Sequence, residues 1–162
     1  MGDPMKAVIQ RVKEAKVVVL GEVVGAIGKG VLVFLGVEKG DTTAAAQALA
    51  AKILKLRLFP MPPATGMTAS TAEAGGEFLV VSQFTLAADL DKGNRPSFDN
   101  AAPPDIAEDL YGYFVEQLKA GPCRVATGKF RAMMDVSLVN DGPVTFILDT
   151  ESMKTVSSRR GR

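Results

Sequence analysis

Two short segments of this chain combine polar side chains with residues that have special backbone properties. The first, SQFTL at residues 82–86, ends an apolar run that predicts a buried strand. Backbone N–H groups at the end of such a strand can converge on a developing oxyanion. The second, NDGPVT at residues 140–145, joins a turn-forming Asp-Gly pair to a proline. Each segment also has a plain structural interpretation, a strand reaching the surface and an ordinary hairpin turn, and the segments alone leave both open.

The pair Gly142 and Pro143 adds a means of selection. Proline after glycine removes one donor from a strand ladder and allows a cis peptide bond. A rigid Gly-Pro unit presents two carbonyl groups in a fixed direction. Because carbonyl oxygens accept hydrogen bonds and repel electron-rich groups, such a unit can distinguish the stereochemistry of an amino group by geometry alone.

Composition excludes the common kinds of side-chain catalysis. The chain has no histidine and one cysteine, Cys123. It therefore lacks Ser-His-Asp triads, the common zinc sites and any internal disulfide. The glycine-rich run at residues 25–30 departs from the phosphate-loop pattern at Val23 and Gly30. We predict neither a metal nor a cofactor, and Thr85 remains a candidate nucleophile with no residue near it in sequence to take its proton.

Length and composition predict one domain at residues 5–150. A chain of 162 residues is long enough to bury a stable core without metals or disulfides. Met5 opens an apolar run, so residues 1–4 are interpreted as a vector-derived remnant. Residues 151–162 carry a cluster of arginines and predict a flexible basic tail.

The charge balance and hydropathy narrow the cellular setting. Nineteen Lys and Arg residues stand against 18 Asp and Glu residues, which argues against coating of long nucleic acid such as DNA but permits contact with a short RNA end. Apolar stretches are far shorter than the roughly 20 residues of a membrane helix, and no signal peptide is evident. We therefore expect a cytoplasmic protein with no membrane partner.

The hydrophobic pattern predicts more strands than helices. Strands are expected at residues 6–12, 16–19, 22–27, 31–37, 77–86, 133–140 and 144–149, with loops at 60–76 and 87–103. One helix is expected from a cap at Asp41 or Thr42 to about Arg57. A second runs from Pro104 to Gly121, with a predicted buried stripe of Ile106, Leu110, Phe114 and Leu118. We expect an α+β fold in which two helices cover curved, mostly antiparallel sheets.

Together with QRV at residues 10–12 and KGNRPSF at residues 92–98, the two segments resemble the D-aminoacyl-tRNA deacylase family, from Met5 to about Leu148. The resemblance implies a deacylase-type fold and a homodimer. It implies chiral proofreading, in which the enzyme hydrolyses the ester that joins a D-amino acid to the terminal adenosine of tRNA. It also implies that the enzyme removes glycine mischarged on alanine tRNA. The expected partner is the 3′ end of aminoacyl-tRNA.

The resemblance also assigns residues to roles. Ser82, Gln83, Phe84 and Thr85 would line the pocket, with Phe84 near the adenine and backbone N–H groups near the scissile carbonyl. Gly142 and Pro143 would carry a cis peptide bond, cross into the partner subunit's pocket and exclude L-amino acids. The residues expected to support the site are Arg11, which would hold the Gly-Pro unit, Met134 in the pocket wall, and Pro96, Ser97, Phe98 and Asn140.

The implied mechanism needs no general base from the protein. A hydroxyl of the terminal ribose would help to activate water while the backbone of residues 82–85 stabilises the oxyanion. Attack by Thr85 ranks second. Two positions depart from the family: Arg131 stands where many relatives have glycine, and Gly66-Met67-Thr68 replaces a Lys-Met-Asn run. Arg131 either contacts tRNA phosphate or extends into solvent.

Three other functions are consistent with the sequence. A sister group of deacylases removes L-alanine from mischarged tRNA, although Phe84 and the Val144-Thr145 pair favour the D-specific type. A noncatalytic module could bind aminoacyl-tRNA ends in the same cleft. A dimeric scaffold could use Gly142 and Pro143 only as an interface hairpin.

Overall fold

The computed structural model describes residues 5–151 and residue 153, and its architecture is built around two long strands. Strand β1, Lys6–Val19, pairs antiparallel with β8, Asp135–Asp149, along most of its length. The sequence predicts two strands in each of these places, and that prediction is wrong. In β1, Lys13 and Glu14 are exposed but stay within the strand, because the neighbouring strand continues to pair beside them. In β8, the Asp-Gly pair forms no hairpin, and the strand continues through it.

The main sheet is mixed. Its order is β2 (Glu22–Ile27), β1, β3 (Gly30–Gly36), β6 (Glu77–Ser82) and β7 (Val125–Thr127), and β8 pairs with β1. The pairings of β1 are antiparallel, whereas β3 with β6 and β6 with β7 are parallel. The parallel pairs follow from the two helical crossovers, since a parallel neighbour needs a long connection. The α+β class and the curved sheet are confirmed.

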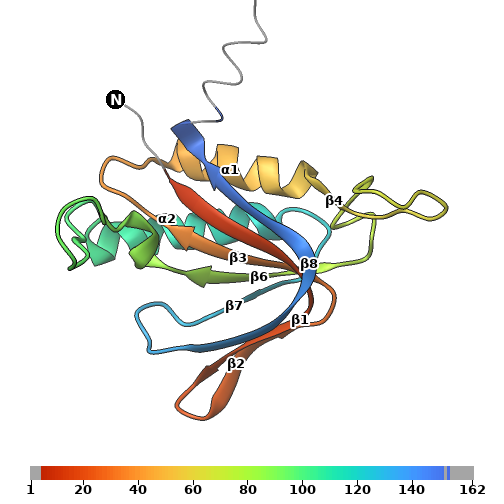
Figure 1. The fold of residues 1–162 in the computed structure, drawn as a ribbon, viewed down its shortest axis with the longest axis horizontal. Coiled ribbons are helices and arrows are strands. Elements are labelled where there is room, and N and C mark those ends of the chain that lie inside the picture. The colour runs from red at the N-terminus through yellow and green to blue at the C-terminus, as the bar shows by residue number, and fades with distance from the viewer. Residues whose placement is uncertain (1–4, 152, 154–162) are drawn as a thin grey trace, which may run out of the picture.

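The sheet curls until β2 lies near β7, so that it nearly closes. Gly25 permits this approach, because a Cβ atom at its position would lie 2.2 Å from the carbonyl oxygen of Thr127. Inside the curl lies a small apolar core. Its buried members are Val12, Ala15, Val17, Ile27, Leu32, Leu79 and Val81. The strands are therefore packed on both faces, since the helices cover the other side (Figure 1).

Two helices pack together on the outer face of the curl. Helix α1, Thr43–Lys55, begins at the cap Thr42, whose hydroxyl accepts a hydrogen bond of 3.2 Å from the amide of Ala45. It ends two residues before the predicted end, because Arg57 begins strand β4, Arg57–Phe59, which pairs with β5, Ala69–Ser70. The second core lies between these helices and the sheet.

Helix α2, Pro104–Lys119, has one error in its predicted buried stripe. Leu110, Phe114 and Leu118 are buried, but the Ile106 side chain is 47% exposed. In the first turn Ala107 instead packs against the core. The helix begins at the predicted proline, which suits a first-turn position because its missing N–H has no helical partner there.

The predicted strand at residues 77–86 ends early. Strand β6 stops at Ser82, and residues Phe84–Ala87 form a 3₁₀ helix, η1. Its partner β3 ends at Gly36, so the last bond along this edge runs from the amide of Gln83 to the carbonyl of Leu35 at 2.8 Å. The short helix then packs over Gly36, where a Cβ atom would lie 2.8 Å from that of Leu86. The polar segment is thus a strand end followed by a tight turn.

The ends of the chain bear on two expectations. The interpretation of residues 1–4 and most of the predicted tail lie outside the described residues. Within the tail, Met153 packs against the core between sheet and helices. Among the described residues, no helix has the length and apolar character needed to cross a membrane.

Candidate active site

A cavity of about 620 Å³ opens beside the end of β6. It lies between η1, the loop at 88–103, the start of α2 and the loop at 128–134, which gather on the left side of Figure 1. Its lining includes the predicted site residues Ser82, Phe84, Phe98 and Met134. Apolar residues provide most of the remaining wall, namely Val37, Ala101, Ala102, Pro103, Pro104, Ala107, Phe130, Ala132 and Met133. Its size is typical of a small-molecule site.

Two aromatic rings stand at this cavity and touch each other. The rings of Phe84 and Phe98 are 5.2 Å apart between centroids and meet edge to face at 64°. Both side chains are largely exposed, at 57% and 42%. Large apolar rings left open to solvent are suited to stacking against a flat ligand such as a nucleobase.

The loop that carries Phe98 is fixed to the sheet. Asp89 and Ser97 exchange two backbone hydrogen bonds of 2.8 and 3.0 Å, which close the loop on itself. The amide of Ala102 donates to Val37 at 3.1 Å, which joins the loop to the segment after β3. Pro96 and Ser97 therefore shape the loop, but neither lines the cavity.

The segment at residues 82–85 presents backbone donors. The first hydrogen bond of η1 runs from the amide of Leu86 to the carbonyl of Gln83 at 3.2 Å. The amides of Phe84 and Thr85 precede this bond and so have no partner within the helix. The side-chain amide of Gln83 donates to the Thr85 hydroxyl at 2.5 Å. The arrangement gives two neighbouring N–H groups beside the cavity, as an oxyanion site requires.

Tyr111 of α2 supports the cavity wall from behind. Its hydroxyl donates to the carbonyl of Val80 at 2.9 Å, two residues before Ser82. Its ring lies 5.9 Å from the ring of Phe130, which lines the cavity. Burial raises the pKa of Tyr111 to about 12, so the hydroxyl stays a neutral donor across the physiological range. The sequence indicated Tyr111 only as a helix residue, and we did not assign it to the site.

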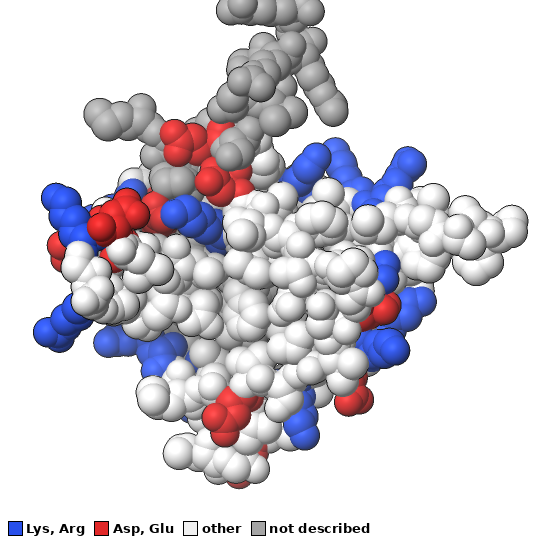
Figure 2. Space-filling view, viewed as in Figure 1, with Lys and Arg blue, Asp and Glu red and all other residues white. Residues whose placement is uncertain are grey.

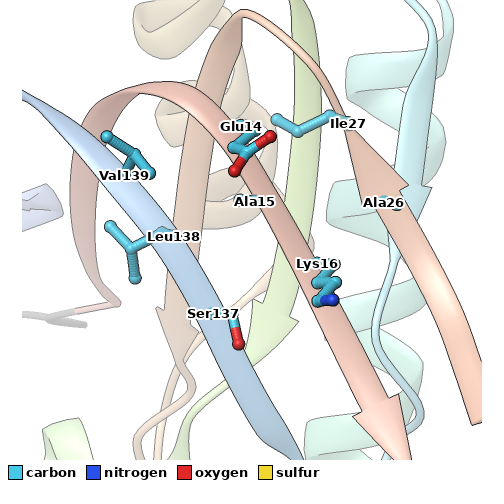
Figure 3. A pocket seen from close by; sticks show the side chains of 8 residues that line it. All are labelled: Glu14, Ala15, Lys16, Ala26, Ile27, Ser137, Leu138 and Val139. Atoms are coloured by element: carbon cyan, nitrogen blue, oxygen red, sulfur yellow. The ribbon is translucent and has the colours of Figure 1, made fainter.

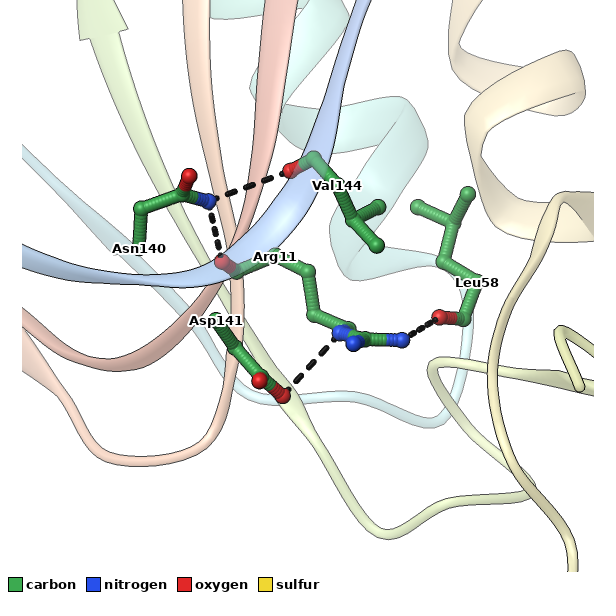
Figure 4. Close-up of polar contacts among 5 residues, drawn as sticks. All are labelled: Arg11, Leu58, Asn140, Asp141 and Val144. Carbon is green, nitrogen blue, oxygen red and sulfur yellow. Dashed lines mark hydrogen bonds and ion pairs between the residues drawn. The ribbon is translucent and has the colours of Figure 1, made fainter. Parts of the chain in front are cut away.

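The Gly142–Pro143 unit lies in a bulge of β8. Asn140 pairs with Val12 and Thr145 pairs with Gln10, so four residues, 141–144, stand opposite Arg11 alone. The Gly142–Pro143 peptide bond is cis, as the resemblance implied. The Asn140 side chain spans the bulge, donating to the carbonyls of Arg11 at 2.9 Å and Val144 at 3.2 Å (Figure 4).

Arg11 holds the other side of the bulge. Its Nε lies 3.0 Å from Oδ2 of Asp141, the residue before Gly142, and its Nη1 donates to the carbonyl of Leu58 at 2.6 Å (Figure 4). Its guanidinium lies 5.8 Å from the centroid of the Phe59 ring. Arg11 therefore ties the bulge to β4. We did not foresee Asp141 as its partner, because the pairing depends on the bulge.

Within one chain, the cavity and the Gly-Pro unit do not meet. Ser82 is in register with Leu35, which pairs with Ala7, whereas the bulge stands opposite Arg11. Four residues along β1 correspond to roughly 13 Å, and two strands separate Ser82 from β8 in addition. None of residues 140–143 lines the cavity. The predicted site residues therefore form two separate groups, one at the end of β6 and one at the bulge in the middle of β8.

A second hollow, of about 420 Å³, crosses the strands β8, β1 and β2 (Figure 3). Glu14 and Lys16 of β1 project beside Ser137 of β8 and Ala26 of β2. None of the predicted site residues lines it. Among the described residues there is also no group of three or more His, Cys, Asp or Glu side chains arranged to hold a metal ion.

Comparison with known proteins identifies the family. The family model described as D-Tyr-tRNA(Tyr) deacylase matches residues 8–149. A D-aminoacyl-tRNA deacylase of Pelobacter propionicus is 59% identical over 90% of this chain and 99% of its own length. That of Geobacter sulfurreducens is 58% identical over 91% and 97%.

Solved structures with a similar fold are also known. A structure titled c-Myc DNA Unwinding Element Binding Protein is 44% identical over 89% of this chain and 97% of its own, with a TM-score of 0.84. A probable eukaryotic D-amino acid tRNA deacylase, 18% identical with a TM-score of 0.77, shares the fold. The chain belongs to the D-Tyr-tRNA(Tyr) deacylase family.

Proposed function

We infer that this protein is a hydrolase that cleaves the ester between a D-amino acid and tRNA. The family match over residues 8–149 carries this inference. The cavity supports it, because it joins two exposed aromatic rings for a nucleobase to two backbone amides after Ser82 that have no partner within η1. Glycine, which has no L side chain to exclude, is expected to be removed from mischarged tRNA as well. We also propose a cytoplasmic location, because the substrate is an aminoacyl-tRNA.

In the proposed mechanism the protein supplies electrostatic stabilisation and the substrate supplies the base. The amides of Phe84 and Thr85 donate to the oxyanion, and a single such donor is worth roughly 3–4 kcal/mol of transition-state free energy. Water attacks the ester carbonyl, assisted by a ribose hydroxyl. Thr85 is the competing nucleophile, but its hydroxyl already accepts a hydrogen bond from Gln83.

A Thr85→Ala variant separates these two routes. Because the alanine keeps the backbone amide, we expect turnover of D-tyrosyl-tRNA within about tenfold of the wild type if water is the nucleophile. A loss beyond about a thousandfold would instead support a covalent route through Thr85. Single-turnover kinetics measure this directly, and Thr43→Ala, at an exposed position of α1 outside the cavity lining, is the matched control.

We further propose that the active unit is a homodimer in which the Gly142–Pro143 unit completes the partner's cavity. The two groups of site residues lie too far apart to act on one substrate within a chain. Strand β8 pairs with β1 alone among the described strands, and Phe146 and Ile147 on it are exposed. Charged side chains are sparse at the centre of the face over β1, β3 and β8 (Figure 2). Such an uncharged face beside an open strand edge suits contact with a second copy.

The first experiment compares deacylation of D-tyrosyl-tRNA and L-tyrosyl-tRNA by the purified protein. We expect hydrolysis of the D-ester alone. A Gly142→Ala, Pro143→Ala variant should also hydrolyse the L-ester. The Gly142 change itself is accommodated, since the nearest atom to its new Cβ is Oδ1 of Asn140 at 3.5 Å. Failure of the wild type to hydrolyse either ester would leave a noncatalytic module or a scaffold, and hydrolysis of L-alanyl-tRNA would indicate the sister group.

Mixing two defective variants tests whether the Gly-Pro unit acts across subunits. Phe84→Ala impairs the cavity, and the double Gly142, Pro143 variant impairs selection. Heterodimers of the two would contain one intact cavity facing one intact Gly-Pro unit, so selective hydrolysis should return on mixing. If the unit acts within its own chain, mixing restores nothing. A mass in solution of twice the 17.1 kDa chain would establish the dimer.

The relative whose title names a DNA unwinding element suggests nucleic-acid binding of another kind. We propose that this chain does not bind DNA, because its basic and acidic residues are nearly balanced. Competition of an AT-rich DNA duplex against D-aminoacyl-tRNA tests this, and strong inhibition of hydrolysis by the duplex would contradict it.

A further inference from the structure

The charges around the cavity all have one sign. Of the described residues that line it, only Lys39 and Arg131 are charged, and both are cations. Neither takes part in an ion pair within the described residues. By contrast, Arg11 and Arg124 are each held against a carboxylate. Two unpaired cations in the wall of an otherwise apolar cavity favour an anionic ligand.

Arg131 also occupies a backbone conformation that does not suit it. Its φ angle is +65°, in the left-handed region that favours glycine. An arginine at such a position costs backbone energy, and its side chain is placed in the cavity wall. A residue kept in an unfavourable conformation at a binding site is a reason to examine what its side chain contacts.

Lys39 is positioned by the same elements that hold the aromatic pair. Its amide donates to the carbonyl of Asn100 at 2.9 Å, in the loop that carries Phe98. Arg131 directly follows Phe130, whose ring is supported by Tyr111. Both cations therefore line the same cavity as Phe84 and Phe98, and each lies in a segment held by backbone hydrogen bonds.

We propose that Arg131 and Lys39 form a phosphate subsite that binds the phosphodiester on the 5′ side of the terminal adenosine. This proposal rests on the proposed function, in which that adenosine occupies the cavity. The ester end of the substrate carries no negative charge before hydrolysis, so the nearest anion is this phosphate. Arginine suits it through its fork of donors and lysine through its compact charge. The subsite would thus favour aminoacyl groups attached to a nucleic acid over aminoacyl esters that lack a phosphate.

The test uses Arg131→Gly. This variant should fold at least as well as the wild type, because glycine adopts a φ angle of +65° without steric strain. Lys119→Ala, which removes a cation at the far end of α2, is the matched control. Binding of 5′-AMP and of adenosine is measured by calorimetry. The wild type and the control should bind 5′-AMP about 10-fold or more tightly than adenosine. Arg131→Gly should lower that preference to about threefold or less and leave adenosine binding unchanged.

Hydrolysis gives a second readout. With D-tyrosyl-tRNA, Arg131→Gly should raise KM at constant kcat and reduce the slope of log(kcat/KM) against log salt by about 0.7. An unchanged preference for 5′-AMP together with an unchanged salt slope would overturn the subsite. Inhibition by free D-tyrosine that disappears in Arg131→Gly, with no effect on 5′-AMP, would assign the cations to the product carboxylate and also overturn it. Because nucleotide binding needs no turnover, failure of the hydrolase function would be recognised separately.

Discussion

The two groups of predicted site residues, at the end of β6 and at the bulge of β8, are built in opposite ways. At the end of β6 the wall is mostly apolar, and the rings of Phe84 and Phe98 face solvent. At the bulge of β8, the residues on either side of the Gly-Pro unit, Asp141 and Val144, are held by polar contacts. Arg11 and Asn140 together contact Asp141, Leu58, Val144 and the backbone of β1.

This difference matches two separate tasks. A surface that receives a substrate gains from open apolar area, which only the ligand covers. A unit that excludes the wrong enantiomer must keep its position when a poor substrate pushes against it, because specificity of this kind depends on repulsion. We therefore expect substitutions at the bulge to change stability and selectivity, and substitutions at the cavity to change binding with little effect on stability.

At the bulge, the largest effect on folding is expected from Arg11→Ala. The change leaves the Asp141 carboxylate and the Leu58 carbonyl without their partner, and hydrogen bonds to charged groups are worth about 1.5–3 kcal/mol. We expect the free energy of unfolding in urea to fall by about 2–3 kcal/mol and hydrolysis of L-tyrosyl-tRNA to rise. Arg11→Lys keeps the positive charge but lacks the planar guanidinium, so its stability and selectivity should lie between those of the wild type and Arg11→Ala. A variant with lowered stability and unchanged selectivity would separate Arg11 from the Gly-Pro unit.

At the cavity, Phe84→Ala should give the reverse result. Stacking of an aromatic side chain on a base is worth about 1–3 kcal/mol, so KM for D-tyrosyl-tRNA should rise about 5- to 150-fold. Because the ring is 57% exposed, unfolding should change by less than about 0.5 kcal/mol. Leu79→Ala removes a buried side chain from the core inside the curl and serves as a control variant that should lose stability. A large loss of stability in Phe84→Ala would contradict the division of tasks between the cavity and the bulge.

The sequence predicted local features of the cavity and of the bulge but not their arrangement. The start of α1 after a cap at Asp41 or Thr42, and the start of α2 at Pro104, were recognisable from capping and proline preferences. The end of the polar segment after Ser82 was not, because it depends on where the neighbouring strand β3 stops. The merging of predicted strands into β1 and β8 likewise depends on pairing between distant residues. Periodicity describes one strand at a time and carries no information about its neighbour.

Candidate site residues could be named from the sequence where a motif is contiguous, but not where the fold brings distant residues together. Phe84 and Gly142 lie in recognisable runs. Tyr111 lies on a helix and reaches Val80 only through tertiary packing, and Lys39 follows a strand with no motif of its own. Arg131 was noticed as a departure from the family, but its left-handed backbone was visible only in the structure.

A smaller effect at the bulge is expected from Asn140→Asp. The side-chain amide donates to two carbonyl groups, and a carboxylate of the same shape cannot donate to either at neutral pH. We expect a loss of about 1–2 kcal/mol in urea unfolding at pH 7. Val139→Thr, at an exposed neighbouring position, should change stability by less than about 0.5 kcal/mol and serves as control. Equal stability of Asn140→Asp and the wild type would mean that the bulge is held by Arg11 alone.

The smallest effect concerns Glu77, at the end of β6 remote from the cavity. The hydrogen bond from the Arg124 side chain, followed by that from the amide of Gly28, lowers the pKa of its carboxyl. A lowered folded-state pKa adds stability that is fully present above the unfolded value of about 4.3 and is lost as pH falls through the folded value. At pH 7 the free energy of unfolding of the wild type should exceed that of Glu77→Gln by about 0.5–1 kcal/mol. The gain is small because the Glu77–Arg124 ion pair is partly exposed. Urea unfolding at pH 7, 5, 4 and 3 should show the gap closing below about pH 4, whereas kcat/KM for D-tyrosyl-tRNA at pH 7 stays unchanged. A gap that is constant with pH would show that the ion pair contributes nothing, and the start of β6 would then be held by strand pairing alone.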